Sequence, residues 1–346
     1  MPIVPSFREG RLTGPRGPQT AFLQEFLSVW GFRAVLAGFR LGVLDALRQE
    51  PADSAALAGR LGLDPRGTGF LLDALDVLGY VEAGPGGRYR ATGRAAALVD
   101  MVGMGLPYFE KIVFTDWQTL EDRLRGESGL PFEVDEPRTP RWLAKEWRLF
   151  QDGMVALANL NLDEVLRRVA VAKGDQHLLD IGGGHGLYSI EFCKRHPRLT
   201  ATVFEIPSME RIARSTIAEH GLAERISFRA GDFFTDDLGS ASIILLFNVI
   251  HSKSEAQNVK LIERAASATE PGGQVVLLDQ FRDRRLGGVG RAFGSFMALS
   301  MFNALGQQTY HLDQVAGWFR AAGLTRVRTV PLRSAPGNGL VLGRRR

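Results

Sequence analysis

The sequence predicts an α/β domain built on a doubly wound sheet, preceded by a smaller and mostly helical domain. Up to about residue 80, apolar residues recur every three or four positions, which is the spacing of amphipathic helices. From Lys173 to the end, apolar runs of strand length alternate with helix-like segments. A glycine-rich turn at 182–186 follows the first of these runs. At 346 residues, the chain is long enough for both domains.

The N-terminal residues divide into an arm and a series of helices. Residues 1–20 are rich in Pro, Gly and Arg and lack the apolar core of a signal peptide, so we expect a loose arm. Apolar spacing predicts one helix over 30–48. Asp53 or the serine after it can cap a second helix, and Asp64 followed by Pro65 can begin a third. On the third helix, the residues expected to be buried are Phe70, Leu71, Leu72, Leu75, Val77 and Leu78.

A hairpin completes the helical domain, which we expect to span residues 21–105. Residues 80–82 and 88–90 have strand character and flank a glycine-rich tip at 84–87. Helices followed by such a hairpin make a winged-helix pattern, which would also suit a DNA-binding regulator. The helix at 64–79 that would enter the major groove carries three aspartates and one arginine, a composition that repels phosphate. The sequence therefore favours a packing and dimerisation module over a nucleic-acid binder.

Two further stretches complete the chain. Residues 106–160 are rich in aromatic and charged side chains and contain several prolines, and we expect a helical linker there. Residues 161–346 are expected to form the α/β domain. Its predicted strands are 177–181, 201–205, 226–229, 242–247, 274–279, 326–330 and 339–342.

The most informative segment joins the first two predicted strands of this domain. Asp180 ends an apolar run, Gly182, Gly184 and Gly186 follow it, and the next strand ends in Glu205. In a doubly wound sheet, ligands bind beyond the carboxyl ends of the strands, and an acid at the second strand tip bonds ribose hydroxyls. Glycines let the backbone approach the ligand closely. We therefore infer a nucleoside site, although the compact spacing D-x-G-x-G-x-G differs from the dinucleotide fingerprint, whose glycines are spaced to fit a pyrophosphate.

Composition limits the class of protein. Hydrophobic residues make up 45% and charged residues 23% of the chain, as in ordinary globular proteins, and no apolar run reaches the roughly 18 residues of a membrane span. The single cysteine, Cys193, excludes an internal disulfide and a cysteine-cluster metal site and favours a cytoplasmic location. The net charge of +4 owes much to the arginine tail at 344–346, so we expect neither a nucleic-acid surface nor a membrane partner.

The D-x-G-x-G-x-G segment resembles the first motif of S-adenosylmethionine-dependent methyltransferases. Over about residues 20–343, the order of winged-helix module, linker and nucleoside-binding domain is similar to the small-molecule O-methyltransferases, which include plant phenolic, acetylserotonin and bacterial antibiotic-tailoring enzymes. The resemblance implies a Rossmann-like class I methyltransferase domain, a winged-helix dimerisation domain, S-adenosyl-L-methionine as cofactor and a homodimer. The apolar residues expected to anchor that dimer are Leu23, Phe26, Phe32 and Phe39.

The resemblance also assigns the cofactor site. The family usually has Asp where this chain has Glu205, which is a conservative departure at the ribose position. In the next motif, the acid Asp232 would bond the adenine amino group and Phe233 would pack on the ring, although Asp232 could instead be a helix cap. The residues that the resemblance assigns to the cofactor are Asp180, Gly182, Gly184, Glu205, Asp232, Phe233 and Phe247.

Residues 245–251 resemble the family's fourth strand and catalytic histidine, which is His251 here. A phenol is a poor nucleophile at neutral pH, and an imidazole can remove its proton as the methyl arrives. Asp279 matches one of the two acids that support this base, whereas the second falls near Thr309, where we find no carboxylate. Ser252 also replaces the usual aspartate. His251 could therefore merely line the pocket, and C- or N-methylation or a reaction without methyl transfer stays open.

The acceptor is expected to be a hydrophobic, aromatic or polyketide-like small molecule. We expect His185 to be exposed beside the cofactor and His311 to begin a helix, and no carboxylate is spaced to complete a metal site with His251. An apolar stripe near residue 300 is either core or a pocket wall in which flexible methionines suit a bulky substrate. The residues implied for the acceptor pocket are Phe150, Met154, Met297 and Met301.

Overall fold

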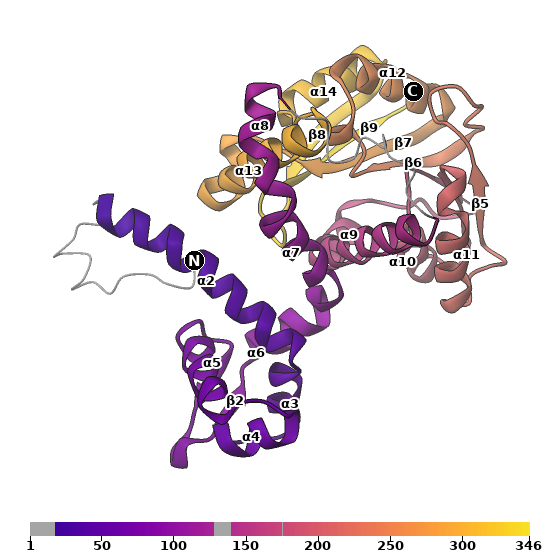
Figure 1. Ribbon diagram of the computed structural model, residues 1–346. Coiled ribbons are helices and arrows are strands. Elements are labelled where there is room, and N and C mark those ends of the chain that lie inside the picture. The colour runs from indigo at the N-terminus through magenta and orange to yellow at the C-terminus, as the bar shows by residue number, and fades with distance from the viewer. Residues whose placement is uncertain (1–17, 128–139, 175) are drawn as a thin grey trace. The chain divides into compact units, whose positions relative to one another are not determined.

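The computed structural model describes residues 18–127, 140–174 and 176–346 (Figure 1). Residues 1–17 of the expected arm lie outside this range, and helix α2 begins at Pro18, inside the arm's expected boundary. The chain divides into two compact units, Met1–Glu110 and Lys111–Arg346, with the division inside helix α7 (Leu106–Phe114). Each unit is described by itself.

The first unit begins with two helices where the sequence predicts one. Helix α2 (Pro18–Arg40) and helix α3 (Val43–Gln49) are separated at Gly42, which has a φ of 72°. A residue in this left-handed conformation ends one helix, and apolar spacing alone does not reveal it. The prediction of one helix was therefore wrong. Within the described ranges, no single helix is long and apolar enough to cross a membrane, and only this bent pair passes that test together.

The next helices begin where their capping residues predict. Asp53 accepts the backbone N–H of Ala56 at the start of α4 (Ser54–Leu61), and Asp64 caps α5 (Pro65–Val77). The predicted burial of α5 was wrong at two positions, because the side chains of Phe70 and Val77 are exposed. The hairpin and the turns after it are β1 (Val81–Ala83), η1 (Pro85–Gly87), β2 (Tyr89–Ala91), α6 (Gly93–Ala97), η2 (Leu98–Val102) and η3 (Gly103–Gly105).

The second unit builds a seven-stranded sheet in the order β5-β4-β3-β6-β7-β9-β8. All neighbouring pairs from β5 to β7 are parallel, whereas β9 pairs antiparallel with both β7 and β8. All seven predicted strands are confirmed, although the fifth begins earlier than expected. They are β3 (Gln176–Ile181), β4 (Leu199–Glu205), β5 (Ile226–Ala230), β6 (Ala241–Phe247), β7 (Thr269–Gln280), β8 (Thr325–Pro331) and β9 (Asn338–Arg344).

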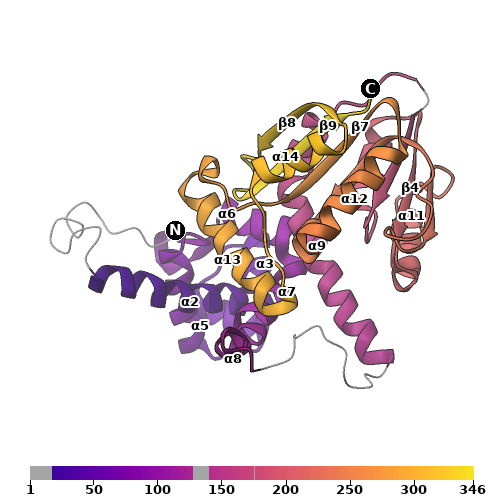
Figure 2. The ribbon, with the colours of Figure 1, turned by 90° about the horizontal axis from the view of Figure 1, so that it is seen from above.

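Helices cover both faces of this sheet (Figures 1 and 2). One core joins strand side chains such as Val203 and Leu245 to helices α9, α10 and α11. The other joins Ile244 and Leu246 to α12 and α14. The alternation of side chains along each strand sends neighbouring residues to opposite cores. The helices are α9 (Pro140–Arg168), α10 (Leu187–Arg195), α11 (Glu210–Glu219), α12 (Glu255–Ala268) and α14 (Leu312–Ala321).

One further helix, α13 (Gly287–Leu305), packs against the segment that precedes α9 rather than on the sheet centre. The indole of Trp117 lies 6.5 Å from the ring of Phe296, and the side-chain amide of Asn303 donates to the carbonyl oxygen of Asp116 at 2.8 Å. This segment consists of η4 (Asp116–Thr119) and α8 (Leu120–Arg125). The short helical turns elsewhere in the unit are η5 (Pro207–Met209), η6 (Ile250–Ser252) and η7 (Arg284–Leu286).

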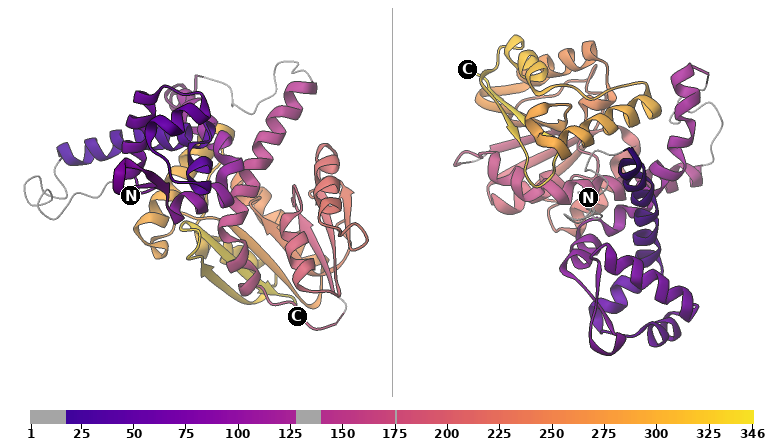
Figure 3. Two further views of the ribbon diagram at one scale, coloured as in Figure 1. Left: turned by 90° about the horizontal axis from the view of Figure 1, so that it is seen from below. Right: turned by 90° about the vertical axis from the view of Figure 1, so that its left-hand side faces the viewer.

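The strand order locates the binding edge of the sheet. From β3, the chain proceeds to β4 on one side, and β6 is its neighbour on the other side. Figure 3 shows the strands of this sheet from two further directions. The loops after β3 and β6 therefore leave adjacent strand ends in diverging directions. Such a topological switch point opens a crevice for a ligand.

Candidate active site

The glycine loop after β3 depends on backbone conformations that only glycine adopts easily. Gly182, Gly184 and Gly186 have φ values of 72°, 53° and 76°. A Cβ on Gly182 would lie 2.7 Å from Cγ2 of Val249, so a larger residue would also clash with the turn after β6. The loop is thus a cradle that excludes side chains, so that a ligand can approach its backbone closely.

Asp180 is buried behind this loop. Its Oδ2 accepts the hydroxyl of Ser189 at 2.8 Å, whereas its Oδ1 is buried without a hydrogen-bond partner among the described residues. Burial, together with repulsion from Glu205, raises the pKa of Asp180 to about 7. The site therefore holds a carboxyl group that ionises near neutral pH and has one unused acceptor.

Glu205 connects the second strand to the loop. Its Oε2 accepts the N–H of Gly184 at 3.2 Å, and its Oε1 accepts the N–H of Ile206 at 2.8 Å. Burial raises its pKa, partly offset by these two bonds and by the charge of Lys253. A carboxylate has about four acceptor positions, so Glu205 can still accept the hydroxyls of a ribose.

Gln151 is a site residue that sequence reasoning missed. It lies on α9, and its Oε1 comes within 3.4 Å of the position that a Cβ on Gly184 would occupy. This oxygen is buried and has no hydrogen-bond partner in the described ranges, while the amide nitrogen contacts the sulfur of Met209 at 3.6 Å. The signal in the sequence was its place beside Phe150, in a segment already implied for the acceptor pocket.

In the motif after β5, the side chain of Asp232 forms a hydrogen bond with the backbone of the motif itself. Asp232 is exposed, and its Oδ1 accepts the N–H of Phe234 at 2.8 Å, which is the local capping alternative considered above. The ammonium of Lys253 lies 5.9 Å from the ring centre of the neighbouring Phe233. At the end of β6, the buried ring of Phe247 packs edge-on against Tyr188 at 4.7 Å.

His251 and Asp279 are brought together as predicted. Nδ1 of His251 lies 2.8 Å from Oδ1 of Asp279, whose side chain is fully buried at the end of β7. The other carboxylate oxygen accepts the backbone N–H groups of Ile250 and His251, at 3.0 and 3.4 Å. Asp279 therefore fixes both the imidazole and the turn that carries it.

The second acid is absent at the expected position. Thr309 is buried, and its hydroxyl donates to the carbonyl oxygen of Gly294 at 3.2 Å. His185 differs from expectation, because it is buried, accepts the N–H of Leu187 and has its pKa lowered by burial to about 4. His311 begins α14 as predicted.

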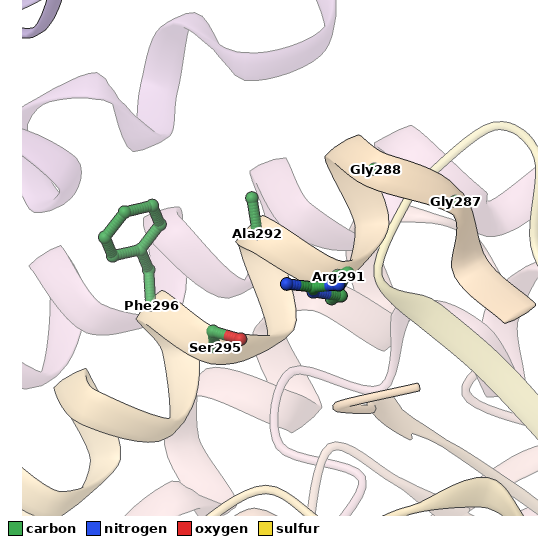
Figure 4. Close-up of a pocket in the computed structure, with 6 residues that line it drawn as sticks. All are labelled: Gly287, Gly288, Arg291, Ala292, Ser295 and Phe296. Atoms are coloured by element: carbon green, nitrogen blue, oxygen red, sulfur yellow. The ribbon is translucent and has the colours of Figure 1, made fainter. Parts of the chain in front are cut away.

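The predicted acceptor residues lie on two helices. Phe150 and Met154 on α9 and Met297 and Met301 on α13 are all half-buried. A cavity of about 690 Å³ lies along α13, where Ala292 and Phe296 point to one side of the helix (Figure 4). This cavity is lined neither by the four predicted acceptor residues nor by His251, so its position does not identify the acceptor site. Its lining residues are Gly287, Gly288, Arg291, Ala292, Ser295 and Phe296.

The ranges that the structure describes contain no group of three or more His, Cys, Asp or Glu side chains arranged to hold a metal ion. Cys193 is a free, buried thiol whose pKa burial raises to about 11. The site's chemistry therefore lies in the glycine loop, the acids and the histidine.

Comparison with known proteins agrees with this geometry. Residues 140–312 match the family model of the O-methyltransferase domain, and residues 26–100 match the O-methyltransferase dimerisation domain. A 3-hydroxy-5-methyl-1-naphthoate 3-O-methyltransferase of Streptomyces sahachiroi is 29% identical over 91% of this chain and 92% of its own. The acetylserotonin O-methyltransferase of Mus musculus is 31% identical over 86% of this chain and 82% of its own.

A solved structure extends the comparison to the cofactor. The S-adenosylmethionine-dependent methyltransferase SibL has a TM-score of 0.74 and 26% identity, and the match covers 94% of this chain and 98% of that one. The family match spans both the helical unit and the sheet unit. The chain belongs to the O-methyltransferase family and is an S-adenosylmethionine-dependent O-methyltransferase with an N-terminal dimerisation domain.

Proposed function

We propose that the enzyme methylates a hydroxyl of a hydrophobic, aromatic or polyketide-like small molecule, with His251 as the general base. The contact of 2.8 Å between His251 Nδ1 and Asp279 Oδ1 carries this proposal. A carboxylate keeps the proton on Nδ1 and leaves Nε2 as the basic nitrogen. Nε2 then removes the hydroxyl proton, and Asp279 stabilises the imidazolium that forms.

Two observations support the fit of the cofactor. The loop at Gly182 leaves no room for a side chain, as a cradle for a ligand requires. The buried acceptors Asp180 Oδ1 and Gln151 Oε1 lack donors in the described ranges, and an amino group would supply them. Glu205 would hold the ribose, with Asp232, Phe233 and Phe247 on the adenine side. When bound, S-adenosylmethionine supplies a methyl carbon that its sulfonium already activates.

The acceptor class rests on the apolar character of the helices around the site and on the relatives. Phe296 and Phe302 on α13 are exposed aromatic side chains, and Met297 and Met301 lie on the same helix. Methionines adapt to bulky aromatic ligands. The bacterial relative is named for a hydroxynaphthoate, which belongs to this chemical class.

Methylation at carbon or nitrogen, or a reaction without methyl transfer, is the alternative, and the threonine at position 309 favours it. The test is methyl transfer from labelled S-adenosylmethionine to a panel of phenols, with His251→Ala and, as the control, the exposed His220→Ala. We expect His251→Ala to lose about 100-fold or more in kcat at neutral pH and to recover partly at high pH. An unchanged rate in His251→Ala would reject His251 as the base.

The match to the dimerisation domain supports a homodimer, and we propose Leu23, Phe26, Phe32 and Phe39 as anchors. The side chains of Leu23 and Phe26 are 52% and 41% exposed, as an unsatisfied interface requires. Phe26→Glu should shift sedimentation toward monomer, whereas Phe70→Glu, at a more exposed aromatic, should not. A dimer unaffected by Phe26→Glu would remove that anchor. A cytoplasmic location stays a prediction of the sequence.

A further inference from the structure

The turn that carries His251, residues 250–253, is hydrogen-bonded by side chains from three other parts of the chain. Asp279 accepts the N–H groups at its start. At its end, the carbonyl oxygen of Lys253 accepts the hydroxyl of Tyr310 at 2.7 Å. The side-chain amide of Asn258 donates to the carbonyls of Ile250 and Lys253, at 2.9 and 3.3 Å. Both ends of the turn are therefore fixed by side chains from other elements.

Tyr310 and Asn258 are suited to hold this turn rigidly. They are 1% and 0% exposed, so water does not compete strongly for their bonds. The ring of Tyr310 packs edge-on against Trp318 at 5.0 Å, which fixes its orientation. Asn258 lies in the first turn of α12, whose start is fixed by the capping box of Ser254 and Gln257.

The backbone of Tyr310 is also tied to the strand that carries Asp279. Tyr310 forms a parallel bridge with Phe281, and its carbonyl accepts the N–H of Arg282 at 3.0 Å. Asp279 lies at the end of β7, and Phe281 and Arg282 follow the strand directly. Asp279, which orients the imidazole, and Tyr310, which holds its turn, are therefore fixed to the same stretch of backbone.

We infer that Tyr310 and Asn258 are positioning residues for His251, and that they supply the support that a second acid would otherwise give. Tyr310 directly follows Thr309, the position at which that acid is missing. The inference rests on the proposed role of His251 as base. Loss of either contact lets the turn move, and a base displaced by a fraction of an ångström transfers the proton poorly.

The first test compares Tyr310→Phe, which removes only the hydroxyl, with Tyr89→Phe, which removes a tyrosine hydroxyl bond to Asp73 in the other unit. We expect Tyr310→Phe to lower kcat about 10-fold at saturating substrates, with the affinity for S-adenosylmethionine by calorimetry within about 2-fold. Tyr89→Phe should leave both unchanged. An unchanged kcat in Tyr310→Phe would overturn the inference.

A second test separates positioning from a general loss of structure. In the His251→Ala background, Tyr310→Phe should have no further effect on kcat, because the residue acts through the base. With an acidic nitrophenol acceptor, which is ionised without a base, the deficit of Tyr310→Phe should also shrink. If Tyr310→Phe lowered kcat by the same factor in the wild type and in His251→Ala, and with a phenol and with the nitrophenol, its role would be purely structural and the inference would be overturned.

A third measurement does not depend on turnover. In protein labelled with ¹⁵N-histidine, the His251 signal, assigned by its loss in His251→Ala, should show the Nδ1–H tautomer in the wild type and a mixture in Tyr310→Phe and Asn258→Ala. Thermal unfolding identifies any variant that fails to fold. An unaltered signal in both folded variants would contradict positioning, whereas failure of methyl transfer alone would count against the proposed function.

Discussion

The loop after β3 and the turn after β6 leave neighbouring parallel strands, yet they are built in different ways. The glycine loop owes its shape to its own backbone, with three glycines at positive φ. The His251 turn owes its shape to side chains that arrive from β7, α12 and the segment before α14. Among the described residues, buried acceptors without donors lie beside both, because Asp180 Oδ1 and Gln151 Oε1 flank the glycine loop and Asn258 Oδ1 lies beside the His251 turn.

This difference separates a binding site from a catalytic one. A loop shaped by its backbone and backed by unpaired acceptors is ready to receive a ligand that brings its own donors. A turn whose groups are already bonded keeps one imidazole in one orientation. Changes at the glycine loop should therefore affect cofactor affinity, whereas changes around the His251 turn should affect turnover.

The largest effect is expected at Asp279. Asp279→Asn replaces one carboxylate oxygen by an amide NH₂ group, which donates hydrogen bonds and does not accept them. When this group faces the imidazole, Nδ1 must accept its hydrogen bond, so the imidazole proton moves to Nε2 and Nε2 is no longer basic. We expect kcat to fall by about 10²- to 10⁴-fold, with S-adenosylmethionine affinity nearly unchanged. The exposed Asp313→Asn serves as the control. A parallel loss of cofactor affinity would erase the proposed distinction between the two sites.

A smaller effect is expected at Gly182, now in binding. Gly182→Ala adds a Cβ 2.7 Å from Val249 at a φ of 72°, whereas Gly221→Ala adds one at a φ of 67° with open space around it. Both variants carry the left-handed strain of about 1–2 kcal/mol, but only the first distorts the cradle. Calorimetry should show about 100-fold weaker cofactor binding in Gly182→Ala, on the scale of 1.4 kcal/mol for each factor of ten. Equal losses in both variants would point to strain alone.

The smallest effect is a pH dependence centred on Asp180. Its pKa of about 7 means that the carboxylate is mostly protonated at pH 6 and mostly ionised at pH 7.5. If it pairs with the cofactor's amino group, affinity should rise about 5- to 10-fold over this interval, with proton release on binding. Calorimetry in buffers of different ionisation enthalpy measures both. Asp180→Asn should flatten the profile, and the exposed Asp163→Asn should not.

The same pKa has a consequence for folding. Because the folded state binds the Asp180 proton more tightly than the unfolded chain does, ionisation opposes folding, and the free energy of unfolding should fall as pH rises from about 4 to about 7. Denaturant unfolding of the ligand-free protein against pH measures this slope. Asp180→Asn should remove the part of this slope that Asp180 causes. An unchanged slope in that variant would assign the pH dependence of unfolding to other groups.

Local sequence determined the elements and the cofactor loop. The strands of the sheet, the caps at Asp53 and Asp64 and the conformation of the glycine loop all follow from neighbours within a few residues, so periodicity and residue type suffice to predict them. The pairing of His251 with Asp279 was predicted from the family resemblance, and it forms because the turn after β6 lies beside the end of the adjacent strand β7.

Only the tertiary structure decided what depends on contacts distant along the chain. The environment of His185 buries it although its loop is polar and rich in glycine, whereas the break at Gly42 is local and is missed because apolar spacing does not reveal it. The proximity of Gln151 to the glycine loop and the bonds of Tyr310 and Asn258 to the His251 turn join segments that no local pattern connects. Side-chain hydrogen bonds require two particular atoms to meet within about 3 Å, and only the packed sheet and helices fix such distances.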